Sequence, residues 1–410
     1  MPDAFGAFVA DQSVQLDDLE PLADLFRGAR VVAIGENAHL IREFYRFRHR
    51  LLQFLVERCG FTVFAMESGF SEGLAVDAWV RGGPGDLREI AHDKITYTMG
   101  RCREMRDHLA WMREAERPVR FVGLDVPGGT ASPLPALDHV AAFLARADPD
   151  ALPLVERLVV RVQKYAGEHS MPAYRAYAEL APADRDAMTA GLAELAARFD
   201  ALEPEYVQAE GTDAYRIIRH ELRLTGLLDQ ALRSYGARVD GDTSHPKVAA
   251  RDRGMAETVF WLLDELGPEA RIVISAHNSH IQRTPVVTPA FALSGMGHHL
   301  ATRLGDDYLT VAVTATAGRT STHRADPAAP GGVAILGADL EAPRDGSVEA
   351  AFAGMDEPRL VDLRPARPGI PGPDSIRLMD GYQETPVLDA YDLLVNLPTI
   401  TTSEQIAGQS

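Results

Sequence analysis

The sequence has few of the features that mark secreted or membrane-bound proteins. Only two cysteines, Cys59 and Cys102, occur in 410 residues, which is too few for a disulfide framework and lacks the spacing of a zinc site. No apolar run approaches the roughly eighteen residues that cross a bilayer. The first residues carry neither a basic region nor a long apolar stretch, so we expect no secretory signal. These absences favour a protein of the reducing cytoplasm.

Positive charge is also in short supply. The chain has 41 Lys and Arg against 59 Asp and Glu, a net charge of -18. Such a chain is not attracted to nucleic acid or to anionic membranes, so we expect neither as a partner. The hydrophobic content of 46% is that of an ordinary globular protein. We expect a monomer that binds a small molecule.

Four short apolar segments each run into ionisable residues. β-branched and aromatic runs of this length are typical of buried parallel strands. In an open α/β sheet, catalytic groups collect at the carboxyl ends of neighbouring strands. The sequence therefore predicts an α/β fold with a mostly parallel sheet and one pocket at that edge. The segments are 31–35, followed by Glu36 and His39; 62–66, followed by Glu67; 119–124, followed by Asp125; and 271–276, followed by His277 and His280.

The middle of the chain has a different character. Residues 127–235 are rich in Ala, Leu, Arg and Glu, show helical periodicity and carry few strand signals. We expect residues 1–126 and 236–410 to form the α/β core, and 127–235 to be a helical insertion forming a lobe over the active-site cleft. A separate helical domain is the alternative. Beyond it we expect strands near 308–313, 360–363 and 392–395, a Pro/Gly-rich connection over 327–337 and a loose polar tail from Thr401.

The segment Glu36-Asn37-Ala38-His39 suggests acid–base chemistry. Residues three positions apart in a helical turn or tight loop lie on one side. A carboxylate beside an imidazole raises its basicity and fixes its tautomer, as a general base working near neutral pH requires. A helix cap followed by a surface histidine is the plainer interpretation of this segment alone. The charged residues at the other strand ends favour the catalytic interpretation.

A metal site is an alternative for the same residues. His277 and His280, together with Glu36, His39 and Glu67, offer enough nitrogen and oxygen donors for a divalent cation. However, the sequence contains no HExxH or HxH motif and no dense acidic cluster. We therefore expect metal-free chemistry with no cofactor.

A serine hydrolase is a second alternative. Residues 69–73 match G-x-S-x-G behind a strand, and Ser71, Asp125 and His277 keep the chain order of an α/β-hydrolase triad. Too few strands precede Ser71 for that fold. The preceding strand is expected to end at Glu67, which leaves no sharp turn at the serine. Near residue 251, Arg251 and Asp252 either reach the pocket or cap a helix.

The motifs at 35–44, 64–70, 121–127 and 276–282, with 296–297 and 304–308, resemble the erythromycin esterase family, and the type II branch most closely. The resemblance covers most of the chain. It implies an α/β core with a helical lobe and hydrolysis of the macrolactone ester of 14-membered macrolides without a serine nucleophile, conferring resistance. It makes His39 the essential base, with supporting roles for Glu36, Arg48, Glu67 and His277.

The resemblance leaves the substrate less well defined than the chemistry. We expect His280, Asp125 and Asn37 to contact the substrate, and His277 and Arg48 to stabilise the oxyanion or protonate the leaving alkoxide. Ala38 and Leu40 replace residues that many members carry beside the base, which reshapes the pocket wall. A biosynthetic enzyme acting on an endogenous polyketide lactone is the alternative, and a macrolide-sequestering protein is a weaker one.

Overall fold

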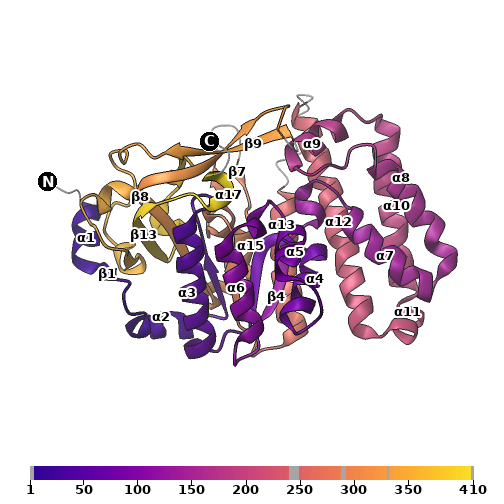
Figure 1. The fold of residues 1–410 in the computed structure, drawn as a ribbon, viewed down its shortest axis with the longest axis horizontal. Coiled ribbons are helices and arrows are strands. Elements are labelled where there is room, and N and C mark those ends of the chain that lie inside the picture. Colours follow the sequence, from indigo (N-terminus) through magenta and orange to yellow (C-terminus); the bar gives the residue numbers. More distant parts are fainter. Residues whose placement is uncertain (1–3, 240–248, 288–291, 330–331, 408–410) are drawn as a thin grey trace.

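The computed structural model describes residues 4–239, 249–287, 292–329 and 332–407. Its main feature is one large sheet, which has nine strands in the described part of the chain (Figure 1). The strand order is β1-β10-β13-β8-β2-β5-β3-β4, and β9 pairs with β8. The strands are β1 (Val14–Gln15), β2 (Val31–Ile34), β3 (Val63–Gly69), β4 (Arg120–Asp125), β5 (Ile272–Ser275), β8 (Tyr308–Ala325), β9 (Val333–Asp339), β10 (Arg359–Asp362) and β13 (Leu393–Ile400).

Neighbouring strands from β13 to β4 run parallel, whereas β1, β10 and β9 pair antiparallel. The prediction of an α/β fold with a mostly parallel sheet is therefore confirmed. The strands β2, β5, β3 and β4 are consecutive in the sheet. Because parallel strands end at the same edge, the polar residues that follow them meet there.

Helices cover both faces of the sheet, because successive strand residues point to opposite faces. Val32 and Phe64 pack in one apolar cluster with residues of α2, α3 and α6, whereas Val31 and Ala65 pack in another with residues of α1, α13 and α15. The helices of the core are α1 (Ala4–Gln12), α2 (Ala23–Arg27), α3 (Arg42–Cys59), α4 (Phe70–Val80), α5 (Leu87–Lys94), α6 (Arg103–Glu114), α13 (Ala250–Leu266), α14 (Asn278–Ile281), α15 (Met296–Leu304), α16 (Val387–Ala390) and α17 (Glu404–Ala407).

Between β4 and α13 the described chain is helical and forms a lobe at one end of the molecule (Figure 1). The lobe contacts the core through α12 on α13 and α7 on α4. The division at 127–235 remains a proposal, because helix positions alone do not fix domain boundaries. The helices are α7 (Leu134–Ala147), α8 (Leu152–Val162), α9 (Ser170–Ala178), α10 (Pro182–Ala201), α11 (Glu203–Glu210) and α12 (Thr212–Val239).

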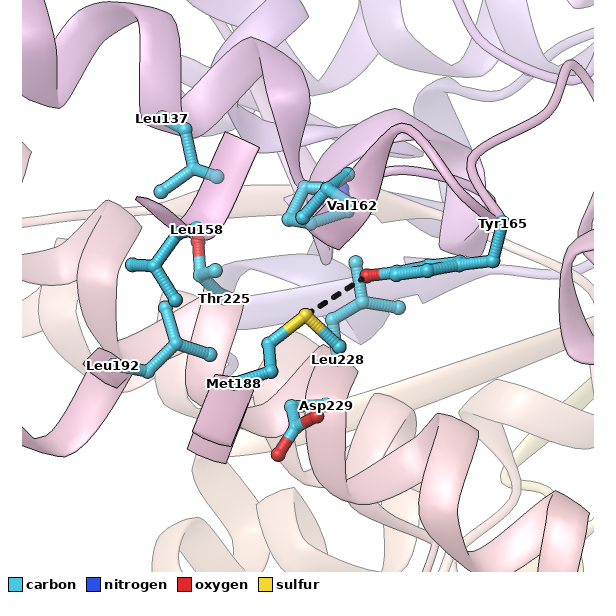
Figure 2. A pocket seen from close by; sticks show the side chains of 10 residues that line it. Leu137, Leu158, Val162, Tyr165, Met188, Leu192, Thr225, Leu228 and Asp229 are labelled. Carbon is cyan, nitrogen blue, oxygen red and sulfur yellow. Dashed lines mark hydrogen bonds between the residues drawn. The ribbon is translucent and has the colours of Figure 1, made fainter. Parts of the chain in front are cut away.

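The lobe has an apolar interior with one small cavity (Figure 2). The Tyr165 hydroxyl lies 3.7 Å from the Met188 sulfur across it. Its volume is about 10 Å³, which is room for about one water molecule. This cavity is therefore a packing defect and not a substrate site.

Three local expectations are wrong. The strand β3 runs to Gly69, two residues beyond Glu67, with a shift of register after Met66. The expected connection over 327–337 contains the start of β9, because Val333 and the residues after it pair antiparallel with the long strand β8. The tail from Thr401 is not loose up to residue 407: it forms α17, and the Ser403 amide donates to the Leu40 carbonyl at 2.8 Å. Residues 408–410 lie outside the described part.

No helix in the described ranges has the length and apolarity needed to cross a membrane. Both cysteines are buried and unpaired.

Candidate active site

The loop after β2 places an acid and a histidine side by side. Gly35 precedes Glu36, and a Cβ at Gly35 would lie 2.0 Å from the Asn278 side-chain oxygen, so only glycine fits. The loop then turns back, and His39 Nδ1 lies 2.7 Å from Glu36 Oε1. The Glu36 side chain is buried, whereas 17% of the His39 side chain is exposed. The structure thus holds His39 from one ring nitrogen, while its Nε2 lies on the side of Glu67, 3.9 Å from Oε1.

Arg48, on α3, contacts Glu36 of this pair. Its Nη1 donates to the Ser275 hydroxyl at 2.8 Å and lies 3.4 Å from Glu36 Oε2. Burial alone would raise the pKa of Glu36, but Arg48 and His39 outweigh it and lower that pKa below its usual range. Arg48 itself is only 3% exposed. Its buried guanidinium therefore helps to keep Glu36 ionised.

Glu67, in β3, links the ends of three strands. Its Oε2 accepts the His277 amide at 2.8 Å, and its Oε1 accepts Arg251 Nη2 at 2.7 Å. His39 Nε2 lies 3.9 Å from the same Oε1. Burial opposes ionisation, but His280, His39 and Arg251 hold the pKa of Glu67 well below its usual range. Glu67 is therefore a carboxylate at neutral pH.

His39 lies between these two carboxylates. Burial disfavours its protonated form, but Glu67 and Glu36 outweigh burial and raise the pKa of His39 above 6.5. A histidine placed in this way takes up a proton readily and stabilises it once bound.

Arg251, on α13, joins Glu67 to Asp125. Its Nη2 lies 2.7 Å from one Asp125 oxygen and its Nε lies 3.0 Å from both. Asp125 also accepts the Tyr97 hydroxyl at 2.8 Å and the Val126 amide, and is fully buried. Asp125 is thus occupied by protein partners, and its geometry suits holding Arg251 in place.

His277 is held as a neutral imidazole. The Ser279 amide donates to its Nδ1 at 3.2 Å, so its Nε2 carries the hydrogen and donates to the Asn37 carbonyl at 2.9 Å. Burial and the nearby His39 lower the pKa of His277 to about 4. Both ring nitrogens therefore have protein partners. The Asn37 side chain is fully buried as well.

His280, in α14, is the positively charged histidine of the site. Its Nδ1 lies 2.7 Å from Asp252 Oδ1 and its Nε2 3.2 Å from Glu67 Oε1. Burial opposes protonation, but Asp252 and Glu67 raise the pKa of His280 to about 10. The imidazolium donates to both carboxylates, so its 3.2 Å approach to Arg251 Nη1 is not a hydrogen bond in this form.

Strained backbone surrounds the cluster. Among the described residues, those other than glycine with a positive φ are Leu40, Tyr97, Thr98, Thr130 and Met379. Leu40 follows His39, Tyr97 binds Asp125, and the Met379 amide donates to the Asn37 carbonyl at 2.8 Å. Such conformations cost about 1–3 kcal/mol each and concentrate at functional sites.

The structure brings every predicted site residue into one region. Glu36, His39 and Glu67 form its centre. Sequence reasoning left Arg251 and Asp252 undecided between pocket and cap, and the structure places both in the network. It missed Tyr97, which lies in a loop without any motif.

Ser71 is the second residue of α4 and is 1% exposed. Its hydroxyl makes no hydrogen bond within the described part of the chain. In the same part, no three His, Cys, Asp or Glu side chains are arranged to hold a metal ion.

Comparisons with known proteins agree on one family. A sequence profile described as erythromycin esterase matches residues 56–400. An erythromycin esterase type II from Escherichia coli is 30% identical over 397 residues, covering 95% of this chain and 94% of that protein. An erythromycin esterase type I from Escherichia coli is 27% identical over 341 residues, covering 82% and 83%.

A solved structure shares the fold. A mutant of the erythromycin esterase EreC in its open conformation matches with a TM-score of 0.84 at 24% identity, covering 95% of this chain and 96% of that one. The family profile spans most of the sequence, and the type II relative matches nearly end to end. The chain therefore belongs to the erythromycin esterase family.

Proposed function

We propose that this protein hydrolyses the lactone ester of 14-membered macrolides by direct attack of a water molecule that His39 activates, and thereby confers macrolide resistance. The observation that carries the proposal is the position of His39. One ring nitrogen is held by Glu36 at 2.7 Å, while the other lies 3.9 Å from Glu67 and has no closer carboxylate in the described part of the chain. The family's named members supply the substrate class.

The first step is proton transfer to His39. Ionised Glu36 keeps the hydrogen on Nδ1, so the lone pair of Nε2 accepts a proton from a water molecule. The water oxygen adds to the ester carbonyl carbon as this proton leaves. Because Glu67 and Glu36 stabilise the imidazolium that forms, the base works near neutral pH. A positioned base of this kind contributes about a hundred- to ten-thousandfold in rate.

The second step needs a positively charged group close to the developing oxyanion and a proton for the leaving alkoxide. We assign the positive charge to Arg251 and the proton to His280, whose side chains are 22% and 16% exposed. Burial and His39 lower the pKa of His277 to about 4, so His277 carries no positive charge near neutral pH, and Arg48 is buried beside Glu36. We propose that His277 and Arg48 do not contact the substrate directly. They instead position the loop that carries His39. Collapse of the tetrahedral intermediate breaks the carbon–oxygen bond, so the product gains one water. The carboxylic acid that is released returns a proton to His280, and His39 loses its proton to solvent.

The proposal includes no serine nucleophile. Two observations favour a structural role for Ser71. It is buried within α4, and its hydroxyl has no histidine partner in the described part of the chain. Ester hydrolysis in this site therefore proceeds without an acyl-enzyme.

Mass spectrometry of 14- and 16-membered macrolides incubated with the protein tests the function. We expect the 14-membered ring to gain the mass of one water. An intact macrolide that binds tightly would instead favour sequestration. Neither binding nor hydrolysis would point to an endogenous polyketide lactone. The cytoplasmic location and the monomeric state remain predictions.

A further inference from the structure

A pocket of about 460 Å³ lies beside the active site, between the hairpin of β8 and β9, the loop after His39 and the C-terminal helix α17. Pockets for small molecules are typically about 300–1,000 Å³. Its lining includes the apolar side chains of Leu40, Val333, Ile335 and Ile406. Unlike the small cavity of the lobe, this pocket is large enough for part of a substrate.

Three chain connections join this pocket to the catalytic groups. Leu40 lines the pocket and directly follows His39. Thr98 lines it and directly follows Tyr97, the partner of Asp125.

The third connection is the hairpin. Ile335 lines the pocket, and its direct partner across the hairpin is His323. Paired residues on antiparallel strands share one face of the sheet. The Ser321 hydroxyl, on β8, donates to the His39 carbonyl, and His323 lies two residues further along the same strand on the same face. The same hairpin face therefore borders both the pocket and the catalytic histidine.

The pocket also contains an unpaired polar group. Gln405 lines it, and neither its amide nitrogen nor its amide oxygen makes a hydrogen bond within the described residues. A buried amide without a hydrogen-bond partner is destabilising. If the Gln405 side chain turns toward the pocket, a ligand with a hydroxyl or carbonyl group on an apolar skeleton can pair with this amide while it covers the apolar wall.

We propose that this pocket is a substrate subsite, which holds an apolar, hydroxyl-bearing part of the lactone while its ester carbonyl lies at His39. The inference rests on the proposed function and extends it by naming Ile335 and Gln405 as residues that determine specificity. It also gives the tail around α17 a role. Ser403 bonds to Leu40 on one side, while Gln405 and Ile406 form the pocket wall on the other.

The test compares two tryptophan substitutions on one strand. Ile335→Trp fills the pocket, whereas Leu336→Trp adds the same bulk at a neighbouring position that is 42% exposed and does not line the pocket. With erythromycin as substrate, we expect Ile335→Trp to raise KM about tenfold or more, because the indole occupies the space in which the substrate binds. We expect its kcat to stay within about twofold. Leu336→Trp should match the wild type in both.

Gln405→Leu is the second variant. It is used if thermal unfolding shows that Ile335→Trp is not folded. It removes the amide at nearly constant size, and we expect KM for erythromycin to rise about fivefold. The same shifts should appear as weaker erythromycin binding when each substitution is combined with His39→Ala. The subsite alone is overturned if the wild type hydrolyses erythromycin and both variants, Ile335→Trp and Gln405→Leu, are folded and have an unchanged KM. A wild type that leaves erythromycin intact overturns the proposed function, and the subsite with it.

Discussion

His39 Nδ1 and Glu36 Oε1 are 2.7 Å apart, and this contact fixes which ring nitrogen of His39 points away from Glu36. Glu36 is ionised because Arg48 and His39 outweigh the effect of burial on its pKa. An ionised acceptor at Nδ1 requires a hydrogen there, so Nε2 is the nitrogen that accepts a proton. The chemistry proposed for this site follows from that one contact.

The pH dependence of kcat/KM should show this relationship. The pKa of His39 is raised above 6.5 by Glu67 and Glu36 against the opposing effect of burial. The base works only when deprotonated, so kcat/KM should rise with pH through this raised pKa and fall below it. Glu36→Gln removes one of the charges that raise the pKa. We therefore expect its acid limb to move to lower pH, with a lower plateau.

Glu57→Gln is the matched control for that measurement, because Glu57 is an exposed glutamate on α3. Its profile should overlay that of the wild type. An acid limb that stays in place in Glu36→Gln would show that another group controls it.

Arg251 should be a large contributor to stability. It pairs with the buried carboxylates of Asp125 and Glu67, both at 2.7 Å. Removing one partner of a buried ion pair costs about 3–5 kcal/mol, because the remaining charge is left uncompensated. We expect Arg251→Ala to lower the free energy of unfolding in urea by about this amount. It should also lower turnover in the fraction that stays folded.

Arg253→Ala is its control, two residues along the same helix. Arg253 is 45% exposed and pairs with Glu257 on the surface, where an ion pair is worth about 0–1 kcal/mol. Equal losses in the two variants would contradict the assigned role of the buried network.

Metal removal should leave activity intact. The side chains that would ligate a cation instead pair with one another: His39 with Glu36, and His280 with Asp252 and Glu67. We expect full turnover of a 14-membered macrolide after exhaustive chelation and dialysis. Loss of turnover that one divalent ion restores would recast these residues as ligands.

The sequence predicted the centre of the site because its signals are local. Each strand contains a short apolar run, and the polar residue that follows the run lies at or near the shared edge of the sheet. Glu36, His39 and Glu67 could be found in this way. The order of the strands needed no separate prediction, since any parallel arrangement brings such ends to one edge.

The residues that sequence reasoning missed depend on contacts between distant segments. Tyr97 reaches Asp125 from a loop with no periodicity. The amide of Ser403 binds the carbonyl of Leu40 across most of the chain, and a polar tail gives no sign of such a partner. Val333 begins a strand only because β8 is long enough to pair with it, although the prolines and glycines before it favour a loop.

Single-turnover hydrolysis of a 14-membered macrolide with enzyme in excess tests the central claim most directly. Mass spectrometry of the quenched mixture measures both the product and the intact protein. We predict a product heavier by one water, no acyl adduct on the protein and unchanged rates for Ser71→Ala. His39→Ala should be slower by about a hundred- to ten-thousandfold. An acyl adduct on Ser71, with Ser71→Ala inactive and His39→Ala active, would contradict the account.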